Sequence, residues 1–75
     1  MTARQGEVQS VTRALSLLTC LGSAEEGQRL TDLARASGLA VSTVHRLLIT
    51  MQQAGFVHFD STQNEWHVGR EAFSV

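Results

Sequence analysis

The chain has 75 residues, which leaves room for one small domain with a core of modest size. Its formal net charge is −1 and its six basic residues are all arginines, which argues against purely electrostatic nucleic-acid binding but permits arginines gathered on one face. One cysteine excludes an internal disulfide and a zinc-finger ligand set, and the apolar runs are too short for a transmembrane segment or a signal peptide.

The first third of the chain has apolar residues at helical spacing. After a flexible N-terminus over residues 1–7, this spacing predicts an amphipathic helix over residues 9–21 that ends near Gly22. Its expected core stripe comprises Val8, Val11, Ala14, Leu15, Leu18 and Leu21. Leu17 and Cys20 lie off this stripe, and they belong either to a broad core face or to a second apolar face used for dimerisation.

Two more helices are predicted on either side of a glycine turn. Thr31 is the expected N-cap of a short helix over residues 31–37, because its hydroxyl can accept a bond from a first-turn N–H. Glycine readily takes the left-handed conformation that closes helices. Gly38 is therefore expected to end the short helix, and Gly55 to end a longer one over residues 41–54.

After Gly55 the pattern changes from helical to alternating. "FVHFD" and "EWHV" on either side of "STQN" predict a β-hairpin with one face on the core. The core face is expected to carry Val57, Phe59, Trp66 and Val68, and the exposed face His58, Asp60, Glu65 and His67. "QRL", residues 28–30, is a further short strand candidate, and residues 70–75 resemble the start of another helix.

This order of elements is typical of a winged helix-turn-helix. We predict a mainly α fold with a small β-hairpin, built as a three-helix core plus a two-stranded wing over residues 8–69. The expected core residues are Val11, Leu15, Leu18, Leu33, Val44, Leu47, Leu48, Val57, Trp66 and Val68.

The helix over residues 41–54 concentrates hydrogen-bonding side chains in its first turns. Opposite its apolar stripe, the outer side carries Ser42, Arg46, Ile49 and Gln53, with Thr43, His45 and Thr50 beside them. In helix-turn-helix proteins this part of the recognition helix meets base edges, and the helix N-terminus attracts phosphate. Arg46 has the length to bond guanine O6 and N7, while short hydroxyls permit close approach to the DNA backbone.

Each of these residues also has a simpler interpretation. Ser42 could act as an N-cap, His45 could cover the helix flank, and Arg46 could be a solvated surface arginine. The DNA-binding interpretation therefore depends on the cluster as a whole.

The chain resembles the DNA-binding domain of IclR-type bacterial transcription regulators. The segments that carry the resemblance are "SVTRALSLL", "LTDLARASGL", "STVHRLL", "GFV" and "WHVG", which together cover nearly everything from Val8 onward. Ala40 and Val41 depart from the family, which often has a proline and a polar or basic residue there. A phosphate contact is then missing at Val41, although this side chain could touch a thymine methyl.

The resemblance implies a homodimer with its recognition helices in successive major grooves of a double-stranded DNA operator. It also implies a longer parent, in which a linker helix beginning near Arg70 leads to a domain that binds a small-molecule effector. The wing tip, residues 61–64, would lie near phosphate or the minor groove; a plain polar turn is the alternative. The predicted DNA contacts are Thr31, Ser42, Thr43, His45, Arg46, Thr50, Thr62, Gln63 and Asn64.

We therefore predict sequence-specific DNA binding as part of a cytoplasmic bacterial transcription regulator, with no enzymatic activity, cofactor, metal or membrane partner. The alternative is a winged-helix protein-interaction or dimerisation module without DNA binding, which the near-neutral charge favours. A third interpretation places a zinc or copper ion on the hairpin face with His58, His67, Asp60 and Glu65, where a solvated face is the simpler explanation.

Overall fold

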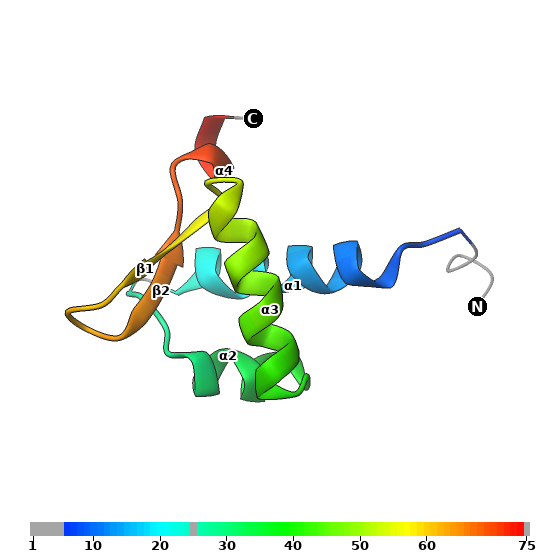
Figure 1. The fold of residues 1–75 in the computed structure, drawn as a ribbon, viewed down its shortest axis with the longest axis horizontal. Helices are drawn as coiled ribbons and strands as arrows, with labels where there is room; N and C mark the ends of the chain where they lie inside the picture. The colour runs from blue at the N-terminus through cyan, green and yellow to red at the C-terminus, as the bar shows by residue number, and fades with distance from the viewer. Residues whose placement is uncertain (1–5, 25, 75) are drawn as a thin grey trace.

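The chain folds as a three-helix domain with a two-stranded wing, as predicted from the sequence. A computed structural model describes residues 6–24 and 26–74, so most of the predicted flexible N-terminus lies outside the described residues. The elements in order are α1 (Gln9–Ser23), α2 (Leu30–Ser37), α3 (Val41–Gln53), β1 (Val57–Asp60), β2 (Glu65–Val68) and α4 (Glu71–Ser74). Figure 1 shows the hairpin on one side of α3 and the N-terminal turns of α1 extending away on the other.

One small core joins the three main helices to the hairpin. Its fully buried side chains come from α1, α2, α3 and β1, and they are Leu17, Leu33, Val44, Leu48 and Val57. Leu21, Ala34 and Trp66 complete this cluster, and Leu18, Leu47 and Val68 pack against it while partly exposed. Burial of each large aliphatic side chain stabilises the fold by about 1.5–3 kcal/mol, so no element is stable without the others.

The rotation of α1 differs from the prediction. Val11 and Leu15, which were expected in the core, are 54% and 57% exposed, whereas Leu17 is fully buried. Cys20 packs against the core beside it, so Leu17 and Cys20 do not form a free dimerisation face. The stripe prediction is confirmed for Leu18 and Leu21 and wrong for its N-terminal part, because α1 is apolar over a wide arc and its first turns extend beyond the helices that could cover them (Figure 1).

All three main helices end close to the predicted glycines, and two of these glycines take the left-handed conformation. Gly38 and Gly55 have φ angles of 74° and 85°, and each lies just past the end of its helix as predicted. The helix α1 ends at Ser23, one residue past Gly22, so its predicted end near Gly22 is confirmed, although this glycine has no positive φ. Thr31 is not an N-cap, because α2 begins one residue earlier at Leu30. Thr31 therefore lies inside the first turn.

The hairpin is antiparallel, with Phe59 opposite Trp66 and His58 opposite His67, so the residues predicted to share a face do share one. Gln28 pairs with the free side of β2 through Gln28 N to Trp66 O at 3.0 Å and Trp66 N to Gln28 O at 2.7 Å. The predicted strand at 28–30 is thus a single bridge. Phe59 is 37% exposed despite lying on the core-side face, since the hairpin extends past the helices.

The end of the hairpin is held tightly against the end of α3. A Cβ added to Gly69 would lie 2.4 Å from the carbonyl oxygen of Gly55, so only glycine fits there without movement. Gly69 N donates to Phe56 O at 2.7 Å, and Glu71 N donates to Gly55 O at 3.0 Å. The start of α4 therefore has a defined position relative to α3.

The rotation of α1 makes a matched pair of substitutions informative. Leu17→Ala is expected to lower the free energy of unfolding by about 2–5 kcal/mol, because it leaves a cavity in the core. Leu15→Ala, two residues away on the exposed side, is expected to change it by less than about 1 kcal/mol. Urea denaturation followed by circular dichroism measures both, and equal losses would contradict this rotation.

Candidate DNA-binding interface

The outer surface of α3 carries a row of polar side chains. Val44 and Leu48 are fully buried on the inner side, which turns Ser42, Arg46 and Thr50 outward at a spacing of four residues. All three are exposed, and the Thr50 hydroxyl donates to the carbonyl oxygen of Arg46 at 3.0 Å. These residues are brought together on one face, as the helical wheel predicts.

The N-terminus of α3 has no side-chain cap. The N-cap position belongs to Ala40, which has no polar side-chain atom to bond them, and the first helical bond runs from Val44 N to Ala40 O at 3.0 Å. Such a helix end attracts an anion through its free N–H groups and its dipole. Ser42 is therefore not the N-cap but lies in the first turn, next to these groups.

The other predicted contacts are less uniform in position. Thr43 is half-buried on the flank of α3, so it is less accessible than Ser42. Thr31 is exposed in the first turn of α2. Its neighbour Leu30 lines the same hollow as His45, which brings the start of α2 close to the outer side of α3.

A hollow of about 240 Å³ separates α3 from the wing. His45, Ile49 and Gln52 line it from α3, and the remaining walls are Leu30, Phe59, Asn64 and Trp66. Gln52 also ties the two elements together, because its Oε1 accepts from Phe59 N at 2.9 Å. Gln52 and Phe59 are not among the residues predicted from the sequence to form the site, because a contact between a strand and a helix leaves no local sequence pattern.

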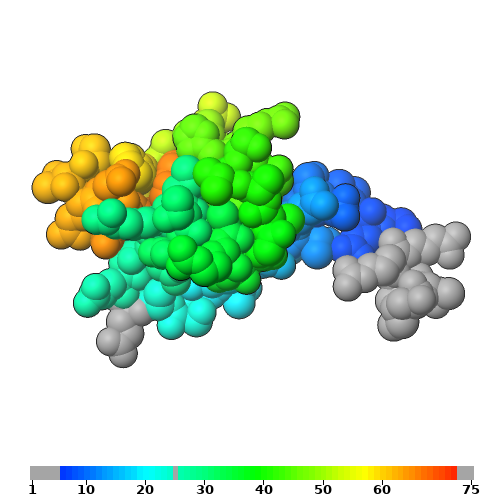
Figure 2. Space-filling view, turned by 90° about the horizontal axis from the view of Figure 1, so that it is seen from below, coloured from blue at the N-terminus to red at the C-terminus, as the bar shows by residue number. Residues whose placement is uncertain are grey.

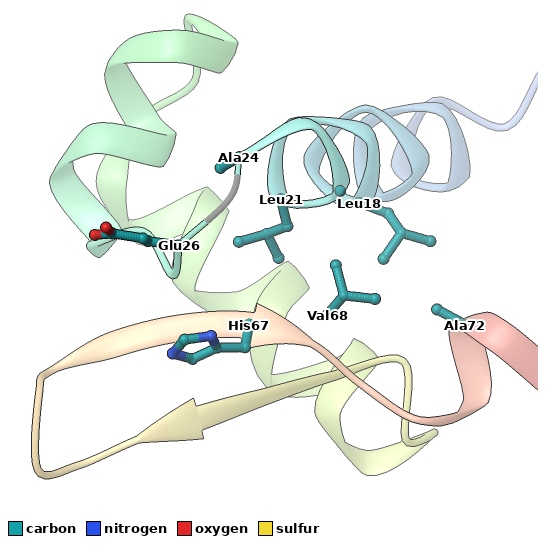
Figure 3. Close-up of a pocket in the computed structure, with 8 residues that line it drawn as sticks. Leu18, Leu21, Ala24, Glu26, His67, Val68 and Ala72 are labelled. Carbon is teal, nitrogen blue, oxygen red and sulfur yellow. The ribbon is translucent and has the colours of Figure 1, made fainter.

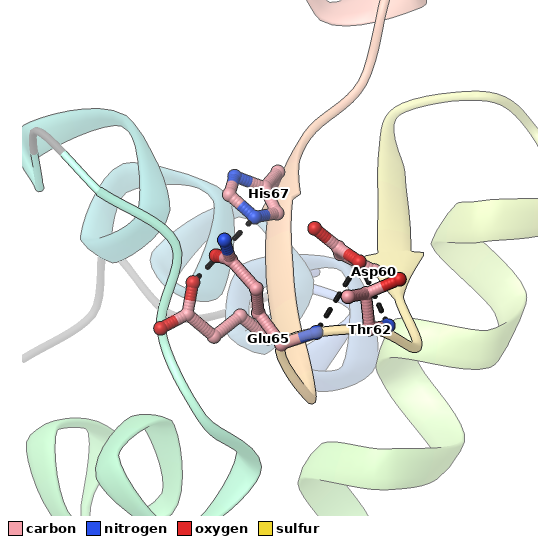
Figure 4. Close-up of polar contacts among 5 residues, drawn as sticks. Asp60, Thr62, Glu65 and His67 are labelled. Carbon is pink, nitrogen blue, oxygen red and sulfur yellow. Dashed lines mark hydrogen bonds and ion pairs between the residues drawn. The ribbon is translucent and has the colours of Figure 1, made fainter.

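The turn of the wing is ordered by one carboxylate. Asp60 Oδ1 accepts from Thr62 N at 2.9 Å and from Gln63 N at 3.4 Å (Figure 4). Asn64 completes the turn with φ of 59°, a conformation that asparagine tolerates better than most residues. The predicted wing residues Thr62, Gln63 and Asn64 are all exposed.

The histidines on the other hairpin face form a stacked pair. The rings of His58 and His67 have centroids 5.2 Å apart and planes 17° apart. His67 Nε2 lies 3.8 Å from Glu65 Oε1 and is buried beneath Gly27, so this face is covered more than the sequence suggests. Within residues 6–24 and 26–74, no group of three or more His, Cys, Asp or Glu side chains could hold a metal ion.

A second hollow, of about 400 Å³, lies on a different side of the domain (Figure 3). Its walls come from the end of α1, from β2 and from α4, with Leu18, Leu21, Val68 and Ala72 supplying apolar surface. Glu26 and His67 are its ionisable lining residues. None of the described residues of α3 lines it, so it is separate from the polar row.

The chain matches the model of the IclR helix-turn-helix domain over residues 10–61. It belongs to this family. It is 47% identical over 70 residues to the transcriptional repressor IclR of Escherichia coli K12, a match that covers 93% of the chain and 26% of the repressor. The crystal structure of HmgR from Pseudomonas aeruginosa superposes with a TM-score of 0.83 at 31% identity, covering 89% of the chain and 28% of HmgR.

A solved structure outside this family shares the same architecture. The Zalpha domain of Cyprinid Herpesvirus 3 ORF112, solved for its binding mode to Z-DNA, gives a TM-score of 0.69 at 26% identity. That match covers 76% of the chain and 92% of the Zalpha domain. The chain itself is a winged helix-turn-helix DNA-binding domain of a transcription regulator, and it spans about a quarter of the length of its curated relatives.

The described part of this IclR-family chain has no helix long and apolar enough to span a membrane.

The carboxylate of Asp60 provides a test of how the wing is ordered. Asp60→Ala removes the acceptor for the two turn amides, so we expect faster exchange at Thr62 N–H and a lower heteronuclear NOE across residues 61–64. Asp60→Asn retains an acceptor oxygen and is expected to preserve most of the order. Unchanged NOE values in the alanine variant would show that the turn does not depend on this side chain.

Proposed function

We propose that the domain reads duplex DNA with α3 in the major groove and with the wing turn at the adjacent backbone or minor groove. The observation that carries this proposal is the outward polar row of Ser42, Arg46 and Thr50. His45 stands beside this row and lines the same hollow as Asn64 of the wing, so helix and wing present one surface. Winged helix-turn-helix domains meet DNA with these two elements.

Each predicted contact has a role suited to its position. Arg46 supplies the long bidentate donor that suits guanine O6 and N7. Ser42 and the free N–H groups of the α3 N-terminus suit a phosphate, and Thr43 supports them from the flank. His45 donates to phosphate or to a base. Thr31, in the first turn of α2, suits a second phosphate.

The wing residues and the remaining helix residue complete the proposed interface. Thr62, Gln63 and Asn64 project from an ordered turn and carry neutral hydrogen-bonding groups suited to the backbone or to the minor groove. Thr50 lies one turn beyond Arg46 in the polar row.

We also propose that the parent is a homodimer and that the exposed face of α1 contributes to the contact. Val8, Val11 and Leu15 are all more than half exposed. A hollow of about 350 Å³ beside this stripe has mostly apolar walls, with Ala14, Leu47 and Met51 among them. A two-fold partner would cover this surface and set the two recognition helices about 34 Å apart, one turn of DNA.

We also propose a cellular role for the full-length parent protein. The relatives are about four times as long as the match, and they are named as repressors and operon regulators. We propose a parent that works in the bacterial cytoplasm at an operator, with α4 as the start of a linker helix to an effector-binding domain. In this proposal the DNA-binding domain covers residues 8–69, and residues 70–75 begin the linker helix.

Arg46 is the first residue to test. Arg46→Ala is expected to reduce the preference for a selected duplex over a random one by about 5- to 150-fold, the equivalent of about 1–3 kcal/mol. Arg13→Ala, which removes the same charge from α1, is the matched control and should keep the preference. Fluorescence anisotropy at low salt measures both variants, with circular dichroism to verify folding.

An unchanged preference in Arg46→Ala would contradict the major-groove assignment. Concentration-dependent self-association without any salt-sensitive DNA binding would favour the protein-interaction alternative instead.

The α1 face has its own test. Leu15→Ser is expected to weaken self-association more than tenfold, since it removes a large apolar side chain from the contact. Val41→Ser makes a similar change at an exposed position on α3 and should leave self-association unchanged. Sedimentation velocity over a concentration series distinguishes them, and equal behaviour of the two variants would exclude this face as the dimer contact.

A further inference from the structure

A second row of side chains runs along α3 beside the polar one, and it is mostly apolar. Val41, His45 and Ile49 are spaced by four residues, so they form one ridge along α3, and His45 and Ile49 of this ridge line the hollow between α3 and the wing. Val41 is 45% exposed and Ile49 is 36% exposed. Exposed apolar side chains on a DNA-binding helix are able to contact an apolar group of the DNA.

The hollow next to Ile49 has stable walls. The ring of Phe59 lies 5.0 Å from that of Trp66, centroid to centroid, and Trp66 is buried in the core. Gln52 holds the Phe59 backbone through its 2.9 Å hydrogen bond. These two contacts hold Phe59 in place, and Ile49 from α3 and Phe59 from β1 both line the hollow.

The chemistry of the lining favours a base edge over a protein segment. The described residues that line the hollow include no acidic side chain, and the polar ones, His45, Gln52 and Asn64, are hydrogen-bonding groups compatible with DNA. The hollow is continuous with the polar row, because Ile49 lies one turn beyond Arg46. In the major groove, the apolar group that a base pair presents is the 5-methyl group of thymine.

We infer that Ile49 and Val41 read thymine methyl groups and so determine part of the sequence specificity. This inference rests on the proposed function, since it requires α3 in the major groove. The two side chains are eight residues apart, or about 12 Å along the helix. With base pairs about 3.4 Å apart, they would meet separate thymines about three or four base pairs from one another.

The test replaces thymine by deoxyuridine, which removes the methyl and leaves the hydrogen bonds of the pair unchanged. A preferred duplex is first selected from a random pool with the chain at low salt. Each thymine is then replaced in turn, and affinity is measured by anisotropy. We expect two positions where loss of the methyl weakens binding by about fourfold, the effect of burying one methyl group.

Protein variants then assign the two positions. Ile49→Ala should abolish the deoxyuridine effect at one position, Val41→Ala should abolish it at the other, and Ile49→Val should retain it. Arg46→Ala should weaken binding yet leave both methyl effects in place. Thermal melting verifies that the exposed-residue variants remain folded.

The experiment distinguishes failure of this inference from failure of the proposed function. If a preferred duplex exists and Arg46→Ala weakens it, but no thymine shows a methyl effect, this inference is wrong and the proposed function stands. The hollow would then contact deoxyribose, and Ile49→Ala would weaken all sequences alike. If no duplex is preferred over any other, both the inference and sequence-specific binding are wrong.

Discussion

The burial of Val44 and Leu48 against Leu17 and Leu33 is the contact on which the rest of this domain depends. These side chains are fully buried, and they bring α3 against α1 and α2 in one rotation. A change of one residue in the helical register would turn the surface by about 100° and move Arg46 away from the outer side. Core packing thus decides which side chains can meet DNA, although no core residue touches it.

The wing has its position for a related reason. Trp66 is buried in the same core, pairs with Gln28 through its backbone and stacks obliquely on Phe59. At the far end, the close approach of Gly69 to Gly55 joins the hairpin to the end of α3. The hairpin is therefore attached at two places, and the surface between wing and helix is continuous. Figure 2 shows this wing and the first turns of α1 at opposite ends of the domain.

Three exposed surfaces follow from this arrangement: the polar row of α3, the mostly apolar row beside it, and the apolar stripe on α1. Together these surfaces explain how a domain with a net charge of −1 is able to bind DNA. Counterion release provides less affinity to such a domain than to a basic one. Shape, specific hydrogen bonds, apolar contacts and a second copy must then supply more of it.

The sequence by itself determined the main elements, the two faces of the hairpin and the cluster from Ser42 to Arg46, because these follow from local spacing and from glycine. It left the rotation of α1 open, since apolar residues surround much of that helix and only the neighbouring elements select Leu17 over Leu15. The hollow between α3 and the wing was also decided by tertiary structure. Its walls come from segments far apart in the chain, and no local periodicity records which of them meet.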